Sequence, residues 1–430
     1  MKKIILLAVT IVLGLMGYLY RTDFSLVKRL VGYNVPEKTE LPLDRPLGSN
    51  LDYLTLPSEL KISIFAEGLK DPRVIVFDPA GRMLVSETKE GRVVALNDKN
   101  KDGKVDEITT VLENLRSPHG LAFYTDKYKK LFLYVAETNQ VMRYDYDVSL
   151  GRVLEATKKN IANLPPDGQH FTRTIAFGKD FRSKPLLPED LRGSVYSDIK
   201  LYISVGSSCD ACEESTWKRA AILEADPEGT YTAEFAGGLR NSVFFTFHPE
   251  TQEMWATEMG RDNLGDDLPP DEVNIIRVAS SEQKYGARRF GWPFCYGNKI
   301  RDKKFKPPKF ERIDIPQDCS QTEAPIIEIP AHSAPLGLAF ITSDRWPKEW
   351  KNDLLVAYHG SWNRSEPTGY KIVKFDVDKN GKLSGTADFV TGWLDKNKIF
   401  GRPVDLKFGP DGALYVSDDS AGLIYKIEPK

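Results

Sequence analysis

Short apolar runs separated by turn residues recur along the chain, and the C-terminal stretch Gly401–Ile427 shows the pattern most clearly. An apolar run at Val404–Phe408 precedes the turn Gly409–Gly412, and a second run at Ala413–Val416 follows it. A polar stretch then leads into a third run. Runs of this kind, bounded by Gly, Pro and Asp, are typical of antiparallel strands joined by tight turns. The pattern therefore predicts a β-meander.

Five further copies of this pattern precede the C-terminal one. They open at Asp71, Pro118, His170, Arg240 and Pro335. One sheet of three or four strands cannot bury both of its faces, so the copies must pack on one another, and a ring of such sheets is a β-propeller. We predict an all-β fold, a six-bladed β-propeller over residues 59–430, with the longer spacers forming loops on one face.

The N-terminal residues 1–20 begin with two lysines and continue as an uncharged apolar run from Ile4 to Tyr20. This run is long enough to cross a thin membrane, and no small-x-small cleavage site is evident. We expect a signal-anchor helix rather than a removed signal peptide, and a body that is exported and held at the membrane, facing the periplasm or the cell exterior. Residues 21–58, with their prolines, are expected to form a tether and a segment packed along the propeller.

Lysine and arginine number 59 against 61 aspartate and glutamate, a net charge of −2, so no nucleic-acid surface is indicated. Four cysteines fit an exported chain, and local pairing of Cys209 with Cys212 and of Cys295 with Cys319 is the simplest of three connectivities. Because Glu213 follows Cys212, the CxxC is not a haem attachment site. A structural disulfide is favoured over a redox role of the thiols.

An acidic loop between the first two copies resembles part of an EF-hand calcium loop. Loop positions 1, 3, 5 and 9 are Asp98, Asn100, Asp102 and Asp106, with Gly103 at the sharp turn. Position 12 is Thr109 instead of the bidentate glutamate. We predict a structural calcium ion here, although the same residues would also suit a solvated hairpin loop.

The residues just ahead of each first strand are the candidates for a functional site. In a propeller the first strands line the central channel, so these residues converge at one end of it. They are Arg73, His119, His170, Thr172, Arg173, Arg240, Asn241, Ser333, Arg402 and Asp405. Histidines, arginines and an amide suit an anionic, planar or polyol ligand, whereas the alternative for each is a hydrogen-bonded structural residue.

Several motifs in order also resemble those of the quinoprotein sugar dehydrogenases. They include GQHFTRTIAFG, GGLRNSVFFTFHP, TEMGRDNLGDDLPPDEVNII, SAPLGLAF and GRPVDLKFGPDGALYVSDD. The family comprises the soluble glucose, aldose sugar and sorbosone dehydrogenases, six-bladed propellers that use pyrroloquinoline quinone and calcium. The resemblance runs from about Leu56 to the C-terminus.

The resemblance implies roles for individual residues. His170 stands where the family has its general base, and Arg240 with Asn241 matches the pair at the quinone. The backbone carbonyls of Gly260 and Arg261 stand where the family binds the cofactor calcium. Arg402 matches the first of two arginines that hold the cofactor carboxylates, because a guanidinium pairs with a carboxylate through two hydrogen bonds.

This sequence also departs from the family pattern. Val404 replaces the second arginine, and His359 replaces a lysine at the quinone. Arg364 and Lys371 are candidates to restore the lost positive charge, and the insertion around Arg364 is closer to the sorbosone branch. Other side chains that could contribute are the aromatic Trp362 and Tyr370 and the acidic Asp262, Asp266, Asp267, Asp271 and Glu272. The aromatic residues could instead be packing residues, and the acidic residues could instead lie in a solvated loop.

The leading hypothesis is an oxidoreductase that oxidises the anomeric C–OH of an aldose, or a related sugar aldehyde such as sorbosone, by transfer of hydride to pyrroloquinoline quinone. Electrons would pass to an external acceptor, a quinone or a cytochrome. The alternatives are a calcium-dependent propeller lactonase, which would not need the arginines at the channel, and a non-catalytic carbohydrate-binding propeller.

Overall fold

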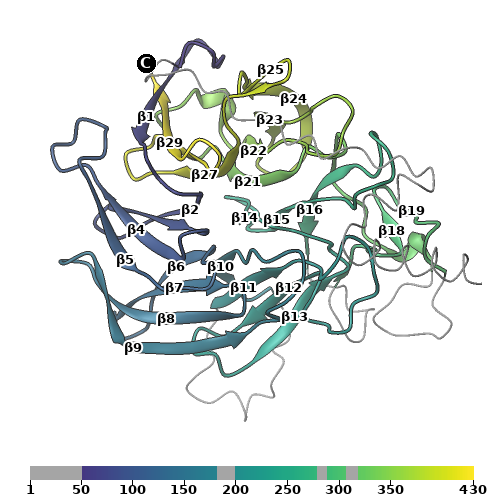
Figure 1. Ribbon diagram of the computed structural model, residues 1–430, viewed down its shortest axis with the longest axis horizontal. Helices are drawn as coiled ribbons and strands as arrows, with labels where there is room; N and C mark the ends of the chain where they lie inside the picture. The colour runs from purple at the N-terminus through teal and green to yellow at the C-terminus, as the bar shows by residue number, and fades with distance from the viewer. Residues whose placement is uncertain (1–50, 182–198, 278–287, 307–317) are drawn as a thin grey trace, which may run out of the picture.

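The computed structural model describes residues 51–181, 199–277, 288–306 and 318–430. In these ranges six sheets of four or five strands are arranged in a ring, with the first strand of each nearest the centre (Figure 1). The predicted all-β, six-bladed propeller is therefore confirmed. The predicted signal anchor at residues 1–20 lies outside the described residues, as does most of the predicted tether.

The blades follow one another along the chain, each a meander from the centre outward. Blade 1 contains β2 (Pro72–Phe77), β3 (Met83–Glu87), β4 (Arg92–Asn97) and β5 (Glu107–Leu112). Blade 2 contains β6 (Leu121–Thr125), β7 (Leu131–Glu137), β8 (Gln140–Asp147) and β9 (Arg152–Asn163). Blade 3 contains β10 (Ile175–Lys179), β11 (Ile199–Val205), β12 (Ala221–Ala225), β13 (Thr232–Gly237) and the short parallel strand β17 (Arg288–Arg289).

The second half of the ring repeats the arrangement. Blade 4 contains β14 (Phe245–Phe247), β15 (Met254–Glu258), β16 (Asp271–Ile276) and β20 (Ile327–Ile329). Blade 5 contains β21 (Pro335–Phe340), β22 (Leu354–Tyr358), β23 (Lys371–Val377) and β24 (Leu383–Val390). Blade 6 contains β27 (Pro403–Phe408), β28 (Leu414–Asp418), β29 (Leu423–Pro429) and β1 (Leu60–Ala66).

Several short elements lie outside the six blade sheets. They are the hairpins β18 (Cys295–Tyr296) with β19 (Ile300–Arg301) and β25 (Leu394–Asp395) with β26 (Lys398–Ile399), and the 3-10 turns η3 (Cys319–Gln321) and η4 (Lys348–Trp350). Within the described ranges no helix has the length and apolar character that a membrane crossing requires.

Strand β1 closes the ring by pairing with the last strand of the chain. It runs antiparallel to β29, with Leu60 opposite Pro429 and Ile64 opposite Tyr425. The sequence pattern showed three strands in the last copy and did not identify this fourth one. The segment before β1 also packs on the ring, since Thr55 forms a bridge with Thr391 and Leu54 is buried.

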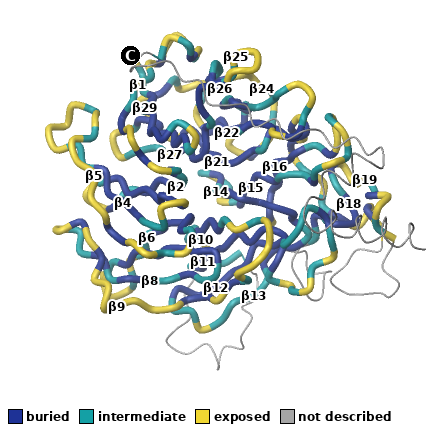
Figure 2. The backbone as a smooth tube through the Cα atoms, viewed as in Figure 1, coloured by how far each residue is buried: buried dark blue, intermediate teal, exposed yellow. Residues whose placement is uncertain are grey.

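The core lies between the blades, in the second strands and the faces that flank them. All residues of β3, β15, β22 and β28 are buried, whereas β5 and β9 at the outside are largely exposed (Figure 2). A strand covered on both faces reads as a continuous apolar run, which is why these segments lack a polar alternation.

A hydroxyl residue near the end of the second strand ties neighbouring blades together. Ser417 accepts from the N–H of Asp405 at 3.0 Å and donates to the carbonyl of Arg73 in the next blade at 2.6 Å. Ser204 makes the corresponding bonds to Thr174 and Val243. These bonds satisfy backbone groups at or just before the first strands, which are bulged in the case of β2 and β27.

An acidic residue at the end of the second strand fixes the segment that enters the same blade. Glu87, Glu137, Glu258 and Asp418 accept hydrogen bonds from the backbone N–H groups of Lys70, Arg116, Asn241 and Arg402. Each carboxylate is buried. The segments that carry the candidate site are therefore positioned by the same device in four blades.

Replacing Ser417 by alanine should destabilise the ring. The change leaves the N–H of Asp405 and the carbonyl of Arg73 without their partner in a buried position, which should lower the free energy of unfolding by about 1–3 kcal/mol. Urea unfolding measures the loss. Ser149→Ala, in an exposed turn, is the control, and equal effects of the two changes would contradict the role of the hydroxyl.

Candidate functional site at the channel mouth

First strands begin, and second strands end, at one end of the ring, which we call the mouth. Contacts between distant segments bring side chains of several blades together there. Arg73 and His359 both reach Asp419, and His119 lies 3.3 Å from the hydroxyl of Thr174. The mouth thus combines side chains from blades 1, 2, 3, 5 and 6.

His170 is held in one tautomer by the residues after β11. Its Nδ1 lies 3.0 Å from the carbonyl and 2.9 Å from the hydroxyl of Ser207, and that hydroxyl donates to the carbonyl of Cys209. Nδ1 must therefore carry the proton, which leaves the lone pair on Nε2. The imidazole is thus oriented to accept a proton at Nε2.

The backbone around His170 is fixed by two guanidinium groups. Arg173 and Arg219 donate to the carbonyl of His170 at 2.9 and 3.1 Å, and both also donate to the carbonyl of Pro165. Arg173 is fully buried. The sequence suggested Arg173 as part of the ligand-binding rim, but its hydrogen bonds all go to backbone carbonyls.

Burial, and then the positive charge of Arg240, lower the pKa of His170 to about 3. The imidazole is therefore neutral over the whole physiological range. Burial also lowers the pKa of His119 well below its usual value, with Arg73 as the next cause. Neither histidine adds positive charge to the mouth.

Gly206 allows His170 and Asn241 to lie close together. A Cβ at this position would lie 2.3 Å from Oδ1 of Asn241 and 2.7 Å from Cβ of His170. A side chain larger than hydrogen would push the two residues apart. The glycine therefore sets the separation between blades 3 and 4 at the mouth.

Arg240 is buried between the loop after β11 and the end of β15. Its Nε donates to the carbonyl of Asp210 at 2.8 Å, and its Nη2 lies 3.0 Å from the Asp210 carboxylate and 3.3 Å from that of Asp262. Nη1 donates to the carbonyl of Met259. Two carboxylates thus fix the guanidinium and balance its charge.

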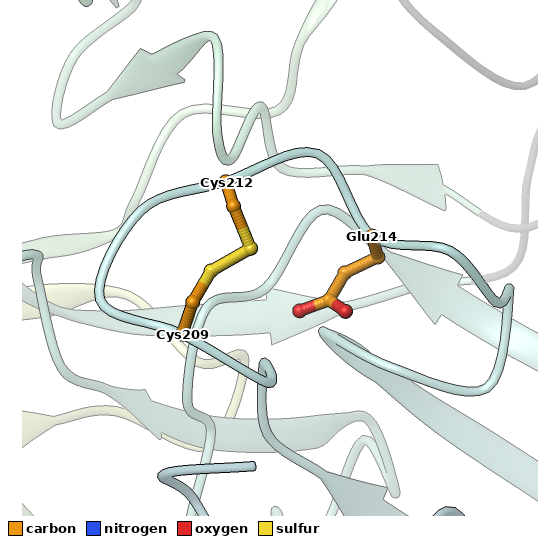
Figure 3. Close-up of side chains that lie close together, drawn as sticks. All are labelled: Cys209, Cys212 and Glu214. Atoms are coloured by element: carbon orange, nitrogen blue, oxygen red, sulfur yellow. A yellow bond between two sulfur atoms is a disulfide. The ribbon is translucent and has the colours of Figure 1, made fainter.

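The loop that carries Asp210 is closed by a disulfide between Cys209 and Cys212. Glu214 points back toward it and accepts from the N–H and hydroxyl of Ser208 (Figure 3). Cys209, Cys212 and Glu214 are the one group of three metal-type ligands that lies close together in the described residues. Because both sulfurs are in the disulfide, they are unavailable as thiolate ligands. The second disulfide joins Cys295 and Cys319.

The segment expected to bind the cofactor calcium is shaped by buried carboxylates. Asp271 accepts from the N–H of Gly260 at 2.8 Å and from that of Ala334 at 2.9 Å. The side chain of Arg261 turns away and pairs with Asp302 at 2.8 Å. The carbonyls of Gly260 and Arg261 accept no hydrogen bond from the described residues, so they are available to a cation.

The acidic run after Arg261 does not form one cluster. Asp262 faces Arg240 and also accepts from Asn363 at 2.8 Å, whereas Asp271 and Glu272 are buried in β16. Asp266 and Asp267 receive hydrogen bonds from the blade 5 insertion. The sequence left open whether these five acidic residues contribute to the site or lie in a solvated loop. Among them, only Asp267 is exposed as a residue of a solvated loop would be.

Asp419 is a site residue that the sequence did not single out, because it reads as a turn residue. His359 Nε2 donates to Asp419 Oδ1 at 2.9 Å, and Arg73 Nη1 lies 2.5 Å from Oδ2. Although burial opposes ionisation, the charges of His359 and Arg73 hold the pKa of Asp419 well below its usual value. This carboxylate offsets the positive charge of Arg73.

Arg402 lies over the ring of Tyr370, with its guanidinium carbon 4.8 Å from the ring centre, and donates to the carbonyl of Gly360. Val404 is fully buried in the apolar core. Arg364 donates to the carbonyl of Asp266 at 2.7 Å and pairs with Asp267. Lys371 pairs with Asp388 on the outer strand of blade 5. Both candidates for added positive charge are therefore engaged elsewhere.

The other rim residues mainly support the backbone. Ser333 donates to the carbonyl of Pro330, and Asp405 accepts from the N–H groups of Ile75 and Leu406. The neighbour of Ser333, His332, which was not among the rim candidates, has its Nε2 2.8 Å from the carbonyl of Gly265. The contacts of these residues are those of hydrogen-bonded structural residues, which was the alternative to ligand binding.

The loop from Asp98 to Asp106 folds around its own acidic side chains. Asp98 accepts from the N–H of Gly103 at 2.9 Å, Asn100 from that of Asp102 at 2.9 Å, and Asp106 from that of Lys99 at 2.7 Å. Gly103 has a φ of +88°, as the sharp turn requires. The structural calcium at this loop stays a prediction.

The chain is similar to several known proteins. A profile described as TrAA12-like matches residues 54–430. An uncharacterized protein of Borreliella burgdorferi is 31% identical over 393 residues, covering 87% of this chain and 90% of that protein. A pyrroloquinoline quinone-dependent sugar dehydrogenase of Hypocrea jecorina is 23% identical over 401 residues, covering 85% and 87%. The calcium structure of the Trichoderma reesei carbohydrate-active enzyme of family AA12 has a TM-score of 0.69 at 22% identity, covering 91% and 99%.

The buried carboxyl of Glu258 should make stability depend on pH. Burial, reinforced by nearby Glu272, raises the pKa of Glu258 to about 8. The native state then holds a proton that the unfolded state releases, so stability is lost as pH rises from about 4.5 to 8. Glu258→Gln should remove this loss. The difference between the urea midpoints of variant and wild type should grow from pH 5 to pH 8.

Glu90→Gln, at an exposed position, is the matched control and should follow the wild type at every pH. Parallel pH profiles for Glu258→Gln and the wild type would show that Glu258 does not bind a proton on folding.

Proposed function

Because the chain belongs to the TrAA12-like family of quinone-dependent sugar dehydrogenase propellers, we propose that it oxidises the anomeric C–OH of an aldose, or a related sugar aldehyde such as sorbosone, with pyrroloquinoline quinone and calcium as cofactors. The observation that carries the proposal is the neutral His170. Its Nδ1 is bonded to Ser207, and Gly206 lies against both the Cβ of His170 and the side chain of Asn241, the residue after Arg240. The names of the relatives suggest this chemistry, and His170 is the base that we propose for it.

The residues at the mouth fit a flat anionic cofactor. Arg73 Nε, His119 Nε2 and Asn363 Oδ1 are buried and lack a hydrogen-bond partner in the described residues. Arg402 presents a guanidinium that is not paired with a carboxylate in the described residues. These groups, with the carbonyls of Gly260 and Arg261, would hold the cofactor carboxylates and the calcium ion. When bound, the quinone would accept hydride from the anomeric carbon, and calcium would polarise it.

The protein's own part in the reaction is to position the sugar and move one proton. His170 Nε2 accepts the proton of the anomeric hydroxyl, while the bond from Nδ1 to Ser207 keeps the ring in place. Arg240 puts a fixed positive charge where negative charge develops. Asn241 is fixed through its N–H, which donates to Glu258 at 2.9 Å.

The pKa of His170 should respond to what occupies the mouth. Burial lowers it first and Arg240 next. An anionic ligand against Arg240 offsets the charge of the guanidinium and raises the pKa toward the range in which an imidazole is an effective base. The proposal therefore couples base strength to cofactor binding.

The proposal extends to the route of the electrons. The CxxC is followed by Glu213 and closed as a disulfide, so it offers no haem attachment. We propose transfer to an external acceptor, a quinone or a cytochrome, and an exported protein that is held at the membrane by residues 1–20. The lactonase alternative has less support, because Glu258 and Asp271 use their oxygens to accept hydrogen bonds from the backbone.

His170→Ala should abolish sugar oxidation while cofactor binding remains. Loss of a general base costs about 10²–10⁴-fold in rate. The assay adds pyrroloquinoline quinone, calcium and a panel of aldoses to the protein and follows reduction of an artificial dye. A variant that binds cofactor and still turns over at the wild-type rate would remove His170 from the reaction, and a wild-type protein that binds no cofactor would contradict the proposal as a whole.

Arg402→Ala should weaken cofactor binding. Hydrogen bonds to a charged group contribute about 1.5–3 kcal/mol, which corresponds to roughly a ten- to hundred-fold change in the dissociation constant. Titration of the cofactor absorbance in the presence of calcium measures it. Arg345→Ala, an exposed arginine in a turn at the other end of the ring, is the control. Equal affinity in both variants would exclude Arg402 as a cofactor ligand.

A further inference from the structure

A pocket that the proposed reaction does not use lies in blade 3, between the loop after β11 and the segment after β17. Its volume is about 160 Å³. The residues that matter for its chemistry are Glu213, Trp217, Glu234, Arg289, Trp292 and Phe294. We call it the outer pocket.

The outer pocket opens at the same end of the ring as the mouth. Because blade 3 is an antiparallel meander, the start of β10, the end of β11, the start of β12 and the end of β13 share that end. His170 precedes β10, whereas residues 213–220 connect β11 to β12. The outer pocket therefore lies radially outward from His170 on the same face.

Two residues connect the outer pocket to the general base. Arg219 lines the pocket and donates to the carbonyls of His170 and Gly206, both at 3.1 Å. Glu214 also lines it and holds Ser208, the neighbour of the residue that orients His170. A ligand in the outer pocket would therefore lie against Arg219 and Glu214, two residues that help to position His170.

The lining of the outer pocket combines aromatic surfaces with hydroxyl and carboxylate groups. Trp217 is 47% exposed although it is a large apolar side chain, and the ammonium of Lys218 lies 5.6 Å from its ring centre. Trp292 Nε1 is buried without a hydrogen-bond partner in the described residues. The carboxylate of Glu213 is exposed and forms no ion pair within the described residues.

This combination suits a sugar ring. A pyranose has apolar C–H faces that pack on an indole and hydroxyls at its rim that donate to carboxylates and accept from N–H groups. Arg289 pairs with Glu234 at 2.5 Å, which removes one charge of each sign from the lining. A pocket of about 160 Å³ is smaller than the sites of about 300–1,000 Å³ that hold drug-sized ligands, so a single ring is the expected occupant.

We propose that the outer pocket is a second carbohydrate subsite, which binds a further ring of an oligosaccharide whose terminal ring reaches the mouth. The part about the terminal ring rests on the proposed function, but sugar binding in the outer pocket does not. The substrate class is then an oligosaccharide or glycan end.

The experiment measures binding of two sugar series to the full-length protein by isothermal titration calorimetry, without quinone. The series are glucose, cellobiose and cellotriose, and glucose, maltose and maltotriose. In at least one series the affinity should rise about ten-fold from the monosaccharide to the trisaccharide, because a ring stacked on an indole adds binding free energy. Trp217→Ala should remove the rise.

Tyr128→Ala changes an aromatic residue that is 78% exposed and lies in the turn between β6 and β7, at the opposite end of the ring, and should keep the rise. Glu213→Gln, also exposed, should reduce it without a change in the thermal midpoint. Affinity that is independent of chain length in both series, or a rise that survives Trp217→Ala, would overturn the proposal.

Dye reduction by the same protein with quinone and calcium separates this proposal from the proposed function. A Trp217-dependent rise without turnover would leave the subsite in place and contradict the dehydrogenase. Turnover of glucose without any effect of chain length would support the dehydrogenase and overturn the subsite.

Discussion

The structure depends on the hydrogen bonds that a hydroxyl and an acidic residue make at the end of the second strand. The hydroxyl of Ser417 joins the inner strands of two neighbouring blades, and the carboxylate of Asp418 fixes the segment that enters its own blade. Glu258 does the same for Asn241. The side chains at the mouth are carried by the segments that these bonds fix, so the geometry of the site follows from the geometry of the ring.

Electrostatics at the mouth is a balance of buried opposite charges. Arg240 faces Asp210 and Asp262, and Arg73 faces Asp419. A buried guanidinium is costly unless its charge is paired or its N–H groups are hydrogen-bonded. Carboxylates do this for Arg240 and Arg73, whereas backbone carbonyls do it for Arg173. Arg402 differs, because a backbone carbonyl and the face of Tyr370 are its neighbours. It is the arginine best suited to an incoming anion.

The sequence predicted the ring and the group of residues at its mouth because both follow from local patterns. Turn residues mark each hairpin, and the position ahead of each first strand fixes which side chains converge. It did not predict β1 as the fourth strand of the last blade, because a pairing between the two ends of the chain has no local signal. Asp419 was missed because an aspartate after a strand reads as a turn. The role of Glu258 could have been found from the sequence. A hydroxyl residue followed by an acidic residue ends several second strands, as in Ser86-Glu87, Thr257-Glu258 and Ser417-Asp418.

The pairing of β1 with β29 also has a consequence for how the protein is made. The first strand of the described residues pairs with their last strand, so that Leu60 lies opposite Pro429 across almost the whole described chain. Contacts at such large sequence separation form late, because closing a long loop costs entropy before the contact forms. Strand β29 must therefore be synthesised before the ring can close. Until then β1 and β28 keep open edges, which another chain could pair with and which a chaperone would have to cover.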